Sequence, residues 1–424
     1  MTRLAAWCTR EHWLIGASLT RVLLGVWAIY HYVLHFPVRG LLWGPDGIWP
    51  YERFVAVRPF LSVWQLNASP LFFEIIYSAA IGVAVAYTLG WWPRLLGMLH
   101  WWMIWSLQER NPFITDGGDN IMRIVLLFLV LVNTGAHFSV AGGRRSLLRL
   151  PLLARQALAV VHNVGVLLIL AQVSMLYLST GLYKAMGELW QNGTALYYIL
   201  RVEEFSWPGV AEFIYRNPYL VVFGTYGTVL FEVLFLPSLF NRWLRYAMIA
   251  AGTLFHIGIS TIMGLVTFGW SMLSIYPLLV TDTEYRSVTR WLRRRLEVMV
   301  LYDGWCPSCT RSVQWLAALD LFSLVDYLSF REPGVVQFWR LDVESAARRI
   351  QSIGAGGRRA EGMDAMICIV ARIPLLWPVL PVFALCRLAA GQRAYDALAA
   401  RRLILVPGHC AGHCAADGRP DARG

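Results

Sequence analysis

Long apolar runs dominate the first two thirds of the chain, and they constrain its fold more than any other feature. A helix needs about 20 apolar residues to cross a bilayer, and in lipid it satisfies all of its own backbone hydrogen bonds. With 57% hydrophobic and 15% charged residues, the chain is too apolar for a soluble globular protein. We therefore predict an all-α polytopic membrane bundle of about eight segments, some of them tilted, re-entrant or packed inside the bundle. The runs lie at 13–36, 71–92, 95–107, 121–138, 158–182, 219–240, 246–262 and 265–280.

The basic residues indicate how such a bundle is oriented. The net charge of +11 comes from arginine clusters between the apolar runs, which is a pattern of membrane topology and not of nucleic-acid binding. With the N-terminus inside, the inner segments hold about twice as many basic residues as the outer ones. We therefore predict a multi-pass protein of a bacterial-type inner membrane, with the lipid bilayer as partner and both termini in the cytoplasm. The run 13–36 is too long for the apolar part of a cleavable signal peptide and is expected to be a span.

This topology places three longer connections on the outer side. The stretches 40–50, 111–120 and 183–218 are rich in Gly, Pro, Trp and Asp, which make tight turns and aromatic anchors at the membrane interface. We expect these connections to roof a cavity whose floor is the helix bundle.

Lys184 is the single lysine among 37 basic residues, and it follows the apolar run 158–182. One interpretation is an interfacial anchor, with the aliphatic stem in lipid and the ammonium group in water. Arginine, however, fills every other anchoring position. A lysine in a water-poor cavity can give up its proton and act as a base, which a guanidinium cannot do. The sequence leaves both interpretations open.

Two histidines are further candidates for a site within the membrane. His256 lies inside the run 246–262, and His137 lies at the end of the run 121–138, nearer an interface. Ionisable side chains are costly at membrane depth and usually face a cavity. The alternative is a structural hydrogen bond between helices.

Residues 13–281 carry several short motifs in a fixed order. They are Trp43-Gly-Pro-Asp-Gly, Asn111-Pro-Phe, Gly118-Asp-Asn, Ala136-His-Phe-Ser, Gly181-Leu-Tyr-Lys, Glu188-Leu-Trp and Phe255-His. This series resembles an HTTM domain, the membrane module of vitamin K-dependent gamma-carboxylases.

In the carboxylases, the lysine of the Gly-x-x-Lys motif is the base that deprotonates vitamin K hydroquinone. The resemblance implies this role for Lys184, and it implies that His137 and His256 line the same quinone-facing cavity. Trp190 belongs to the lysine–tryptophan motif and is expected to contact the quinone. The large soluble domain that binds the propeptide in the carboxylases is not found after the last apolar run. We therefore expect an oxidation or transfer reaction with a quinone or hydroquinone, and not glutamate carboxylation.

The pattern changes after an arginine-rich stretch that ends at residue 295. Residues 297–302 have the composition of a strand, and a helical pattern follows as far as Asp320. We therefore predict a membrane domain at 1–296 and a small α/β domain with a C-terminal tail at 297–424.

Two further elements are predicted in the second domain. Residues 347–353 and 358–361 flank a glycine turn and are expected to form a hairpin. The apolar run 373–388 carries three prolines. We expect it to be a helix on the surface of the domain or of the membrane, and not a span.

Seven cysteines with one close pair indicate a specific redox site and not a disulfide scaffold. Cys306 is expected at the N-terminus of a helix, where N–H groups stabilise a thiolate, and Cys309 lies one turn later, within reach of a mixed disulfide. The alternative is a zinc site. It would need two more ligands, for which the candidates are the tail residues His409, Cys410, His413 and Cys414. We expect a redox dithiol and no metal.

The stretch Tyr302-Asp-Gly-Trp-Cys-Pro-Ser-Cys309, followed by Asp320 and by Gly362-Met-Asp-Ala, resembles the DCC family of thiol-disulfide oxidoreductase-like proteins over residues 297–414. The resemblance implies a thioredoxin-like fold and a redox-active disulfide between Cys306 and Cys309. It also implies that Asp303 helps to take the proton from a thiol. In the cytoplasm the pair is expected to rest in the reduced state.

Together these features predict a membrane redox protein that holds a quinone-like molecule at Lys184 and carries a cytoplasmic dithiol site. Its redox partner is an unknown small molecule or protein. One alternative is a non-enzymatic immunity, signalling or export-partner protein whose bundle binds a peptide or lipid. Another is that only the dithiol domain is active and the bundle anchors it. Because the predicted topology puts Lys184 and Cys306 on opposite faces, coupling would need a mobile quinone.

Overall fold

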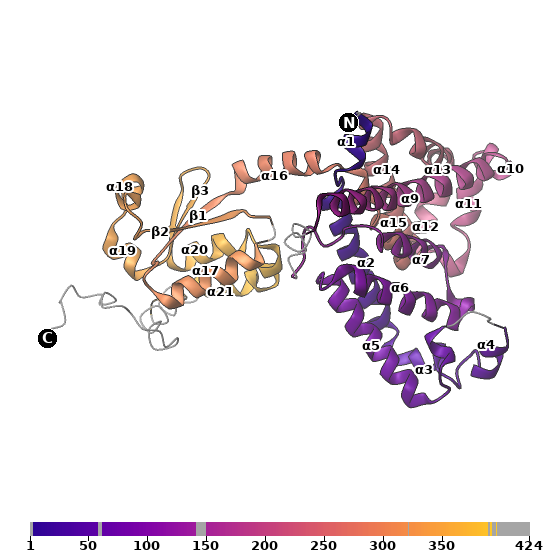
Figure 1. Cartoon of the computed structure of the whole chain (residues 1–424). Coiled ribbons are helices and arrows are strands. Elements are labelled where there is room, and N and C mark those ends of the chain that lie inside the picture. The colour runs from indigo at the N-terminus through magenta and orange to yellow at the C-terminus, as the bar shows by residue number, and fades with distance from the viewer. Residues whose placement is uncertain are drawn as a thin grey trace. The chain divides into compact units, whose positions relative to one another are not determined.

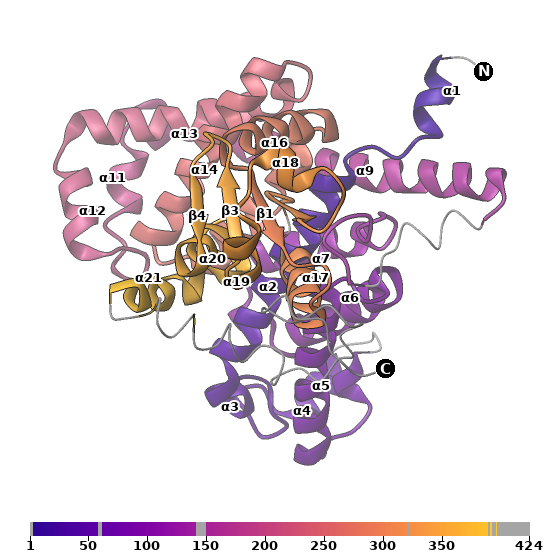
Figure 2. The ribbon, with the colours of Figure 1, turned by 90° about the vertical axis from the view of Figure 1, so that its left-hand side faces the viewer.

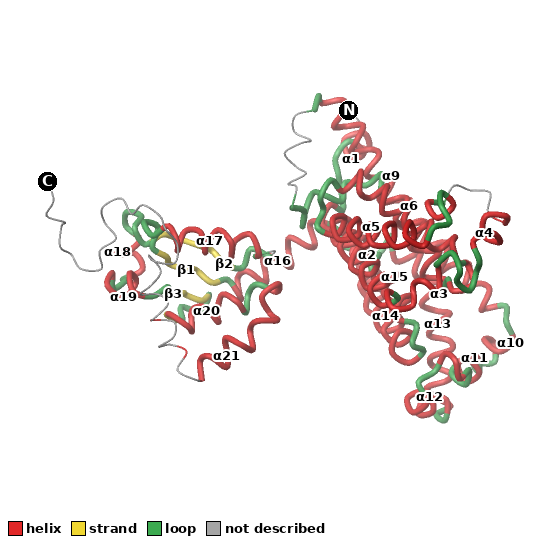
Figure 3. Tube along the Cα trace, turned by 90° about the horizontal axis from the view of Figure 1, so that it is seen from below, coloured by secondary structure: helices red, strands yellow, loops and turns green. Residues whose placement is uncertain are grey.

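The computed structural model describes residues 3–57, 62–140, 150–320 and 322–388, together with residues 391 and 396. The chain forms two compact units, Met1–Asp282 and Thr283–Gly424. The first unit is a bundle of helices, and the second is built on a small sheet (Figures 1 and 3). The predicted fold class, a helical bundle followed by a small α/β domain, is confirmed.

Four helices in the described part of the chain are long and apolar enough to cross a membrane. They are α2 (Leu14–Leu34), α5 (Pro70–Thr88), α9 (Leu152–Ala185) and α13 (Pro218–Ser238). This finding is compatible with a membrane protein, whereas the orientation of the termini stays a prediction. The other helices of this unit are α1 (Arg3–Cys8), α3 (Arg39–Trp43), α4 (Tyr51–Val57), α6 (Pro93–Arg110), α7 (Gly117–Leu129), α10 (Glu188–Gln191), α11 (Ala195–Ile199), α12 (Pro208–Tyr215), α14 (Arg242–Ile262), α15 (Val266–Leu273) and the 3-10 helix η5 (Tyr276–Leu279).

Two of the predicted apolar segments end earlier than expected. The run 121–138 gives α7, which stops at Leu129: the N–H groups of residues 130–132 bond carbonyls three residues back, and the backbone N–H of Asn133 then donates to His162 Nδ1 at 2.9 Å. The run 265–280 divides into α15 and η5, since Pro277 cannot continue an α-helix.

Proline and asparagine set the starts of several long helices. Proline occupies the first turn of α5, α6 and α13, where its missing N–H costs no helical hydrogen bond. The side chain of Asn217 caps α13 by accepting from the N–H groups of Tyr219 and Leu220, and Asn241 caps α14 in the same way. These signals fix where the apolar segments begin.

Two of the three Gly/Pro/Trp-rich connections are joined by buried polar side chains. Arg110 donates to the carbonyls of Trp49 and Gly44, both at 2.6 Å, and Asn111 donates to Leu42 O at 2.8 Å. The stretches 40–50 and 111–120 are therefore held together at one end of α6. The third connection, 183–218, folds into α10, α11 and α12, and α11 and α12 pack on α13.

The C-terminal unit contains one mixed sheet with the strand order β2-β1-β3-β4. Strand β1 pairs parallel with β2 and antiparallel with β3, and β3 pairs antiparallel with β4. Figure 2 shows β1, β3 and β4 side by side. The strands are β1 (Val298–Tyr302), β2 (Val325–Ser329), β3 (Gln351–Gly354) and β4 (Arg359–Glu361). The helices are α16 (Asp282–Leu296), α17 (Pro307–Leu319), α18 (Val335–Trp339), α19 (Val343–Arg348), α20 (Gly362–Val370), the 3-10 helix η6 (Pro374–Val379) and α21 (Leu380–Leu388).

Strand β1 is apolar on both sides because helices cover both faces of the sheet. Val298 and Val300 pack with residues of α17 and α20, and Leu301 packs with residues of α18 and α19. Alternation along the strand places these side chains on opposite faces. The hairpin of β3 and β4 was predicted correctly. Its first strand is shorter than expected, because residues 343–348 belong to α19. The run 373–388 is divided between η6 and α21.

Candidate functional site

The cysteine pair lies where β1 passes into α17. Cys306 is the N-cap residue of α17 and Pro307 is its first residue, so Cys309 lies in the first helical turn. The Cys306 carbonyl accepts from the backbone N–H of Thr310 at 3.0 Å. Both cysteines are present as thiols, Cys306 buried and Cys309 half-buried. We call residues 303–309 the dithiol turn.

The helix N-terminus gives this position its chemistry. The first N–H groups of a helix lack carbonyl partners within the helix and carry a partial positive charge, which favours a thiolate at the N-cap and in the first turn. Two thiols one turn apart can then form and resolve a mixed disulfide. The predicted strand, cysteine pair and helix therefore all occur in the predicted order.

Asp303 is held by an arginine that sequence reasoning did not identify. Arg331 donates from Nε to Asp303 Oδ1 at 3.0 Å and from Nη2 to Oδ2 at 3.1 Å. Its guanidinium carbon lies 4.4 Å from the centre of the Trp305 ring and 4.6 Å from that of Phe330. Both carboxylate oxygens of Asp303 are thus engaged. The predicted role of Asp303 as a proton acceptor would require this ion pair to open.

Arg331 reaches the dithiol turn through strand pairing. In the parallel register Tyr302 is opposite Ser329, so the residues that follow β1 and β2 emerge at the same edge of the sheet. A Cβ atom at Gly304 would lie 2.4 Å from Ser329 Oγ and 3.0 Å from Ser329 Cβ, so a larger residue there would force Ser329 to shift. No short motif links position 331 with 303, and this explains why the sequence analysis missed it.

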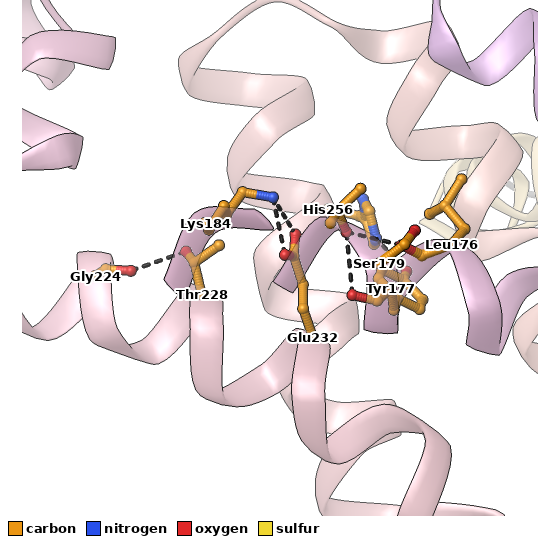
Figure 4. A network of polar contacts seen from close by, with 9 residues as sticks. Leu176, Tyr177, Ser179, Lys184, Gly224, Thr228, Glu232 and His256 are labelled. Atoms are coloured by element: carbon orange, nitrogen blue, oxygen red, sulfur yellow. Dashed lines mark hydrogen bonds and ion pairs between the residues drawn. The ribbon is translucent and has the colours of Figure 1, made fainter. Parts of the chain in front are cut away.

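In the bundle, Lys184 forms an ion pair with Glu232, which lies on α13. Lys184 Nζ is 2.7 Å from Oε1 and 2.8 Å from Oε2. Figure 4 shows both contacts as dashed lines. The side chain of Glu232 is 6% exposed and that of Lys184 is 25% exposed. Trp190, the predicted quinone contact, lies with its ring centre 5.5 Å from Nζ.

Glu232 is the second residue that sequence reasoning missed, although a signal was present. It is the only acidic residue in the 21 residues of α13, and an acidic residue in an apolar span is costly unless it is paired or functional. Gly181 makes room for it: a Cβ atom there would lie 3.0 Å from the Cβ of Glu232. The Gly181-x-x-Lys184 spacing therefore lets α9 and α13 approach at the ion pair.

His256 belongs to a second polar cluster that includes the same helix α9. Its Nε2 is 2.6 Å from the hydroxyl of Tyr177, and this hydroxyl is 3.0 Å from that of Tyr276. All three side chains are buried. Tyr177 lies two turns before Lys184 on α9, and Figure 4 shows Glu232 between Lys184 and the Tyr177–His256 contact. We call Lys184, Glu232, Tyr177, His256 and Tyr276 the bundle site.

His137 lies apart from the bundle site. Its backbone N–H donates to Ser18 Oγ at 3.2 Å, and the nearby Asn133 is bonded to His162 in the first part of α9. Lys184 is 22 residues further along the same helix, a rise of about 33 Å. The structure therefore brings Trp190 to Lys184 and His256 to Tyr177, which lies on the same helix as Lys184. It does not bring His137 to Lys184.

The predicted alternative of a zinc site depends on residues of the C-terminal tail. In the part of the chain that the structure describes, no three His, Cys, Asp or Glu side chains are grouped so that they could hold a metal ion. The tail residues proposed as ligands, His409, Cys410, His413 and Cys414, lie outside the described residues.

Comparison with known proteins gives two relatives of the chain and a family model that matches its C-terminal part. The chain is similar to the uncharacterized protein YitO of Bacillus subtilis (strain 168), with 25% identity over 303 residues that cover 68% of this chain and 93% of the relative. It is also similar to the sporulation-delaying protein SdpB of the same strain, with 28% identity over 229 residues that cover 52% of this chain and 68% of the relative. No solved structure matches the chain. The resemblance of the membrane part to HTTM domains stays a prediction. Residues 300–406 match the family model of the DCC1-like thiol-disulfide oxidoreductase, which confirms the predicted resemblance of the C-terminal part.

Proposed function

We propose that the protein exchanges thiols and disulfides at the dithiol turn. The observation that carries this proposal is the place of Cys306 at the N-cap of α17, with Cys309 in the first turn. One cysteine thiolate attacks a sulfur of the substrate disulfide, forms a mixed disulfide and releases the first substrate thiolate. The other cysteine attacks the mixed disulfide. The products are a Cys306–Cys309 disulfide and two substrate thiols, so two electrons pass to the substrate.

Access to the pair limits this reaction. Cys306 is only 3% exposed, whereas Trp305 directly before it is 53% exposed. Reactive cysteines are usually partly accessible. The substrate therefore approaches over the exposed Gly304–Trp305 segment, and Trp305 is expected to contact it.

The test uses the full chain, reduced and purified in detergent, with an aromatic model disulfide whose thiol product absorbs light and with a dithiol reductant that returns the Cys306–Cys309 disulfide to two thiols after each turnover; the rate without protein is subtracted. Cys306→Ser and Cys309→Ser are each expected to abolish multiple turnover. Cys368→Ser, which changes a half-buried cysteine of the same unit outside the pair, is the matched control and should keep the parent rate. Full activity of Cys306→Ser would refute the proposal.

We propose as a second function that the bundle site binds a hydroquinone or quinone and takes a proton from it. The supporting observation is a charged pair, Lys184 and Glu232, with the carboxylate buried between two apolar helices. Groups of this kind in a membrane bundle usually serve a ligand or a proton path. Within the pair, Lys184 passes its proton to Glu232 and then accepts the proton of a hydroquinone hydroxyl. Trp190 would stack on the ring, and His256 with Tyr177 and Tyr276 would bond the second oxygen.

The test follows the oxidation of a soluble hydroquinone by dissolved oxygen, which takes two electrons and two protons from it. Oxygen reacts faster with the deprotonated hydroquinone, so the protein is expected to accelerate the reaction and Lys184→Ala should lose this acceleration. Lys184→Arg is the decisive variant, because it keeps the positive charge but cannot serve as a base. If Lys184→Arg is as active as the parent, the base proposal fails, and the non-enzymatic alternative, a bundle that binds a peptide or lipid, is favoured.

A further inference from the structure

We propose that α16 is an interfacial helix that binds an anionic lipid surface through its arginines. This inference concerns neither the dithiol turn nor the bundle site, and it does not depend on the proposed functions. It rests on the faces of the helix, on the anchoring of its first residue and on the partners of its arginines.

The helix has a basic face and an apolar face. Arg286, Arg290 and Arg294 follow one another at intervals of four residues, so they lie along one side, and all three are exposed. The apolar residues Val288 (55% exposed), Trp291 (56%) and Leu296 (40%) lie on the other half of the helix. An exposed apolar stripe beside a row of arginines is the pattern of a helix that lies in the headgroup region of a membrane.

The first residue of α16 is tied to the start of a candidate membrane span. The carboxylate of Asp282 accepts from the N–H of Leu14 at 3.1 Å and from the N–H of Ile15 at 2.9 Å. These are the first N–H groups of α2, which a span must present near the membrane surface because they have no partners within the helix. The start of α16 is therefore held at the level of the headgroups.

The arginines of α16 differ in their partners. Arg290 donates only within the helix, to Arg286 O at 3.3 Å and to Ser287 Oγ at 3.4 Å, and stays exposed. Arg293 donates to Glu297 and Asp326, each at 3.1 Å, and so serves the fold of the C-terminal unit. Arg295 lies with its guanidinium carbon 5.2 Å from the centre of the Trp291 ring, on the apolar side. The three arginines of the basic face complement an anionic surface, and this charge pattern selects acidic phospholipids over zwitterionic ones.

The experiment uses the full chain reconstituted into lipid nanodiscs, either of phosphatidylcholine alone or with about one third phosphatidylglycerol. Amide hydrogen exchange of peptides from residues 283–296 is measured by mass spectrometry. We expect these amides to exchange about tenfold more slowly in the anionic discs, and the difference to fall at high salt, because salt screens exposed charges. Peptides from β1 should exchange equally in both discs.

A triple variant, Arg286→Gln with Arg290→Gln and Arg294→Gln, should lose the difference between the discs. The matched control, Arg311→Gln with Arg340→Gln and Arg358→Gln, removes the same charge from exposed positions of the same unit outside α16 and should keep it. Val288→Glu should reduce the protection without removing an arginine. Equal exchange in the two discs, or equal protection by inorganic phosphate in neutral discs, would overturn the proposal.

Discussion

The dithiol turn is built mainly from residues that are adjacent in the chain, whereas the bundle site is built from residues that are far apart in it. Seven consecutive residues supply both cysteines and Asp303, and one parallel strand pairing adds Arg331. The bundle site instead draws its groups from α9, α13, α14 and η5, and the two members of its ion pair are 48 residues apart.

The surroundings of the two charged pairs differ as well. Asp303 (11% exposed) and Arg331 (23%) are about as exposed as Glu232 (6%) and Lys184 (25%), but they border the exposed residues Gly304 and Trp305. Glu232 is buried between helices that are apolar along most of their length. The ion pair with Lys184 is the main contact that offsets the cost of burying its charge. The comparison therefore predicts that losing a partner costs stability in the bundle but changes mainly reactivity at the dithiol turn.

The largest effect is expected from breaking the ion pair of the bundle site. Lys184→Met leaves the carboxylate of Glu232 buried without its partner and should lower the free energy of unfolding by about 3–5 kcal/mol. Glu232→Gln should cost less, because the partly exposed ammonium of Lys184 can reach water. The double variant Lys184→Met with Glu232→Leu should recover much of the loss. Thermal unfolding in detergent measures all three; a harmless Lys184→Met would show that the pair is not needed for the fold.

A smaller effect, on reactivity, is expected at the dithiol turn. Arg331→Met leaves the negative charge of Asp303 uncompensated beside the cysteines, and a nearby carboxylate disfavours a thiolate. Alkylation by iodoacetamide should become about tenfold slower at pH 7, with the rate profile moved to higher pH.

The double variant Asp303→Asn with Arg331→Met removes both charges and should restore the parent profile. Arg358→Met, at an exposed position of the β3–β4 hairpin, should change nothing. Arg331→Met could instead unfold the domain and leave the pH profile of alkylation unchanged in the protein that stays folded. In that case Arg331 serves only the fold.

Helix contact at the bundle site gives the third test. Gly181→Ala places a Cβ atom 3.0 Å from the Cβ of Glu232, whereas a Cβ atom at Gly227 on α13 meets nothing within 4 Å. Alanine favours a helix over glycine at both positions, so the contact decides the difference. Gly181→Ala is expected to be about 1–2 kcal/mol less stable than Gly227→Ala in the same thermal unfolding assay. Equal stabilities would mean that α9 and α13 can separate at the pair without cost.

The smallest effect concerns Tyr327 in β2, whose hydroxyl is buried without a hydrogen-bond partner among the described residues. Burial raises the pKa of Tyr327. The unfolded chain therefore releases this proton first, near the ordinary tyrosine pKa of about 10, and stability is lost as the pH rises above that value. Tyr327→Phe should change the free energy of unfolding by less than about 0.5 kcal/mol at pH 7 and should be the more stable form above pH 10. The full chain is unfolded in urea at pH 7 and above pH 10, and the unfolding of residues 297–388 is monitored by their susceptibility to proteolysis. The free energies of unfolding of the parent and of Tyr327→Phe are then compared.

Local signals predicted much of the fold because they act within a few residues. Apolar length marked the helices of the bundle, four of which are long and apolar enough to cross a membrane in the described part of the chain. The change of pattern near residue 297 marked the start of the small α/β domain, and the glycine turn marked the hairpin. The early end of α7 was missed, because the chain after it bonds a distant residue: the N–H of Asn133 donates to His162. Arg331 was missed for the same kind of reason, because the register of β1 and β2 brings it to Asp303.

The sequence by itself determined the apolar segments, the start of the small α/β domain, and the placing of Cys306 and Cys309 at a helix N-terminus. Each depends on backbone geometry and solvation within one or two turns. Only the tertiary structure decided that Lys184 pairs with Glu232, that His256 bonds Tyr177, that the backbone of His137 bonds Ser18, and that Arg331 holds the dithiol turn. These contacts join residues distant in the chain, and their energy depends on burial and orientation, which a one-dimensional pattern does not contain.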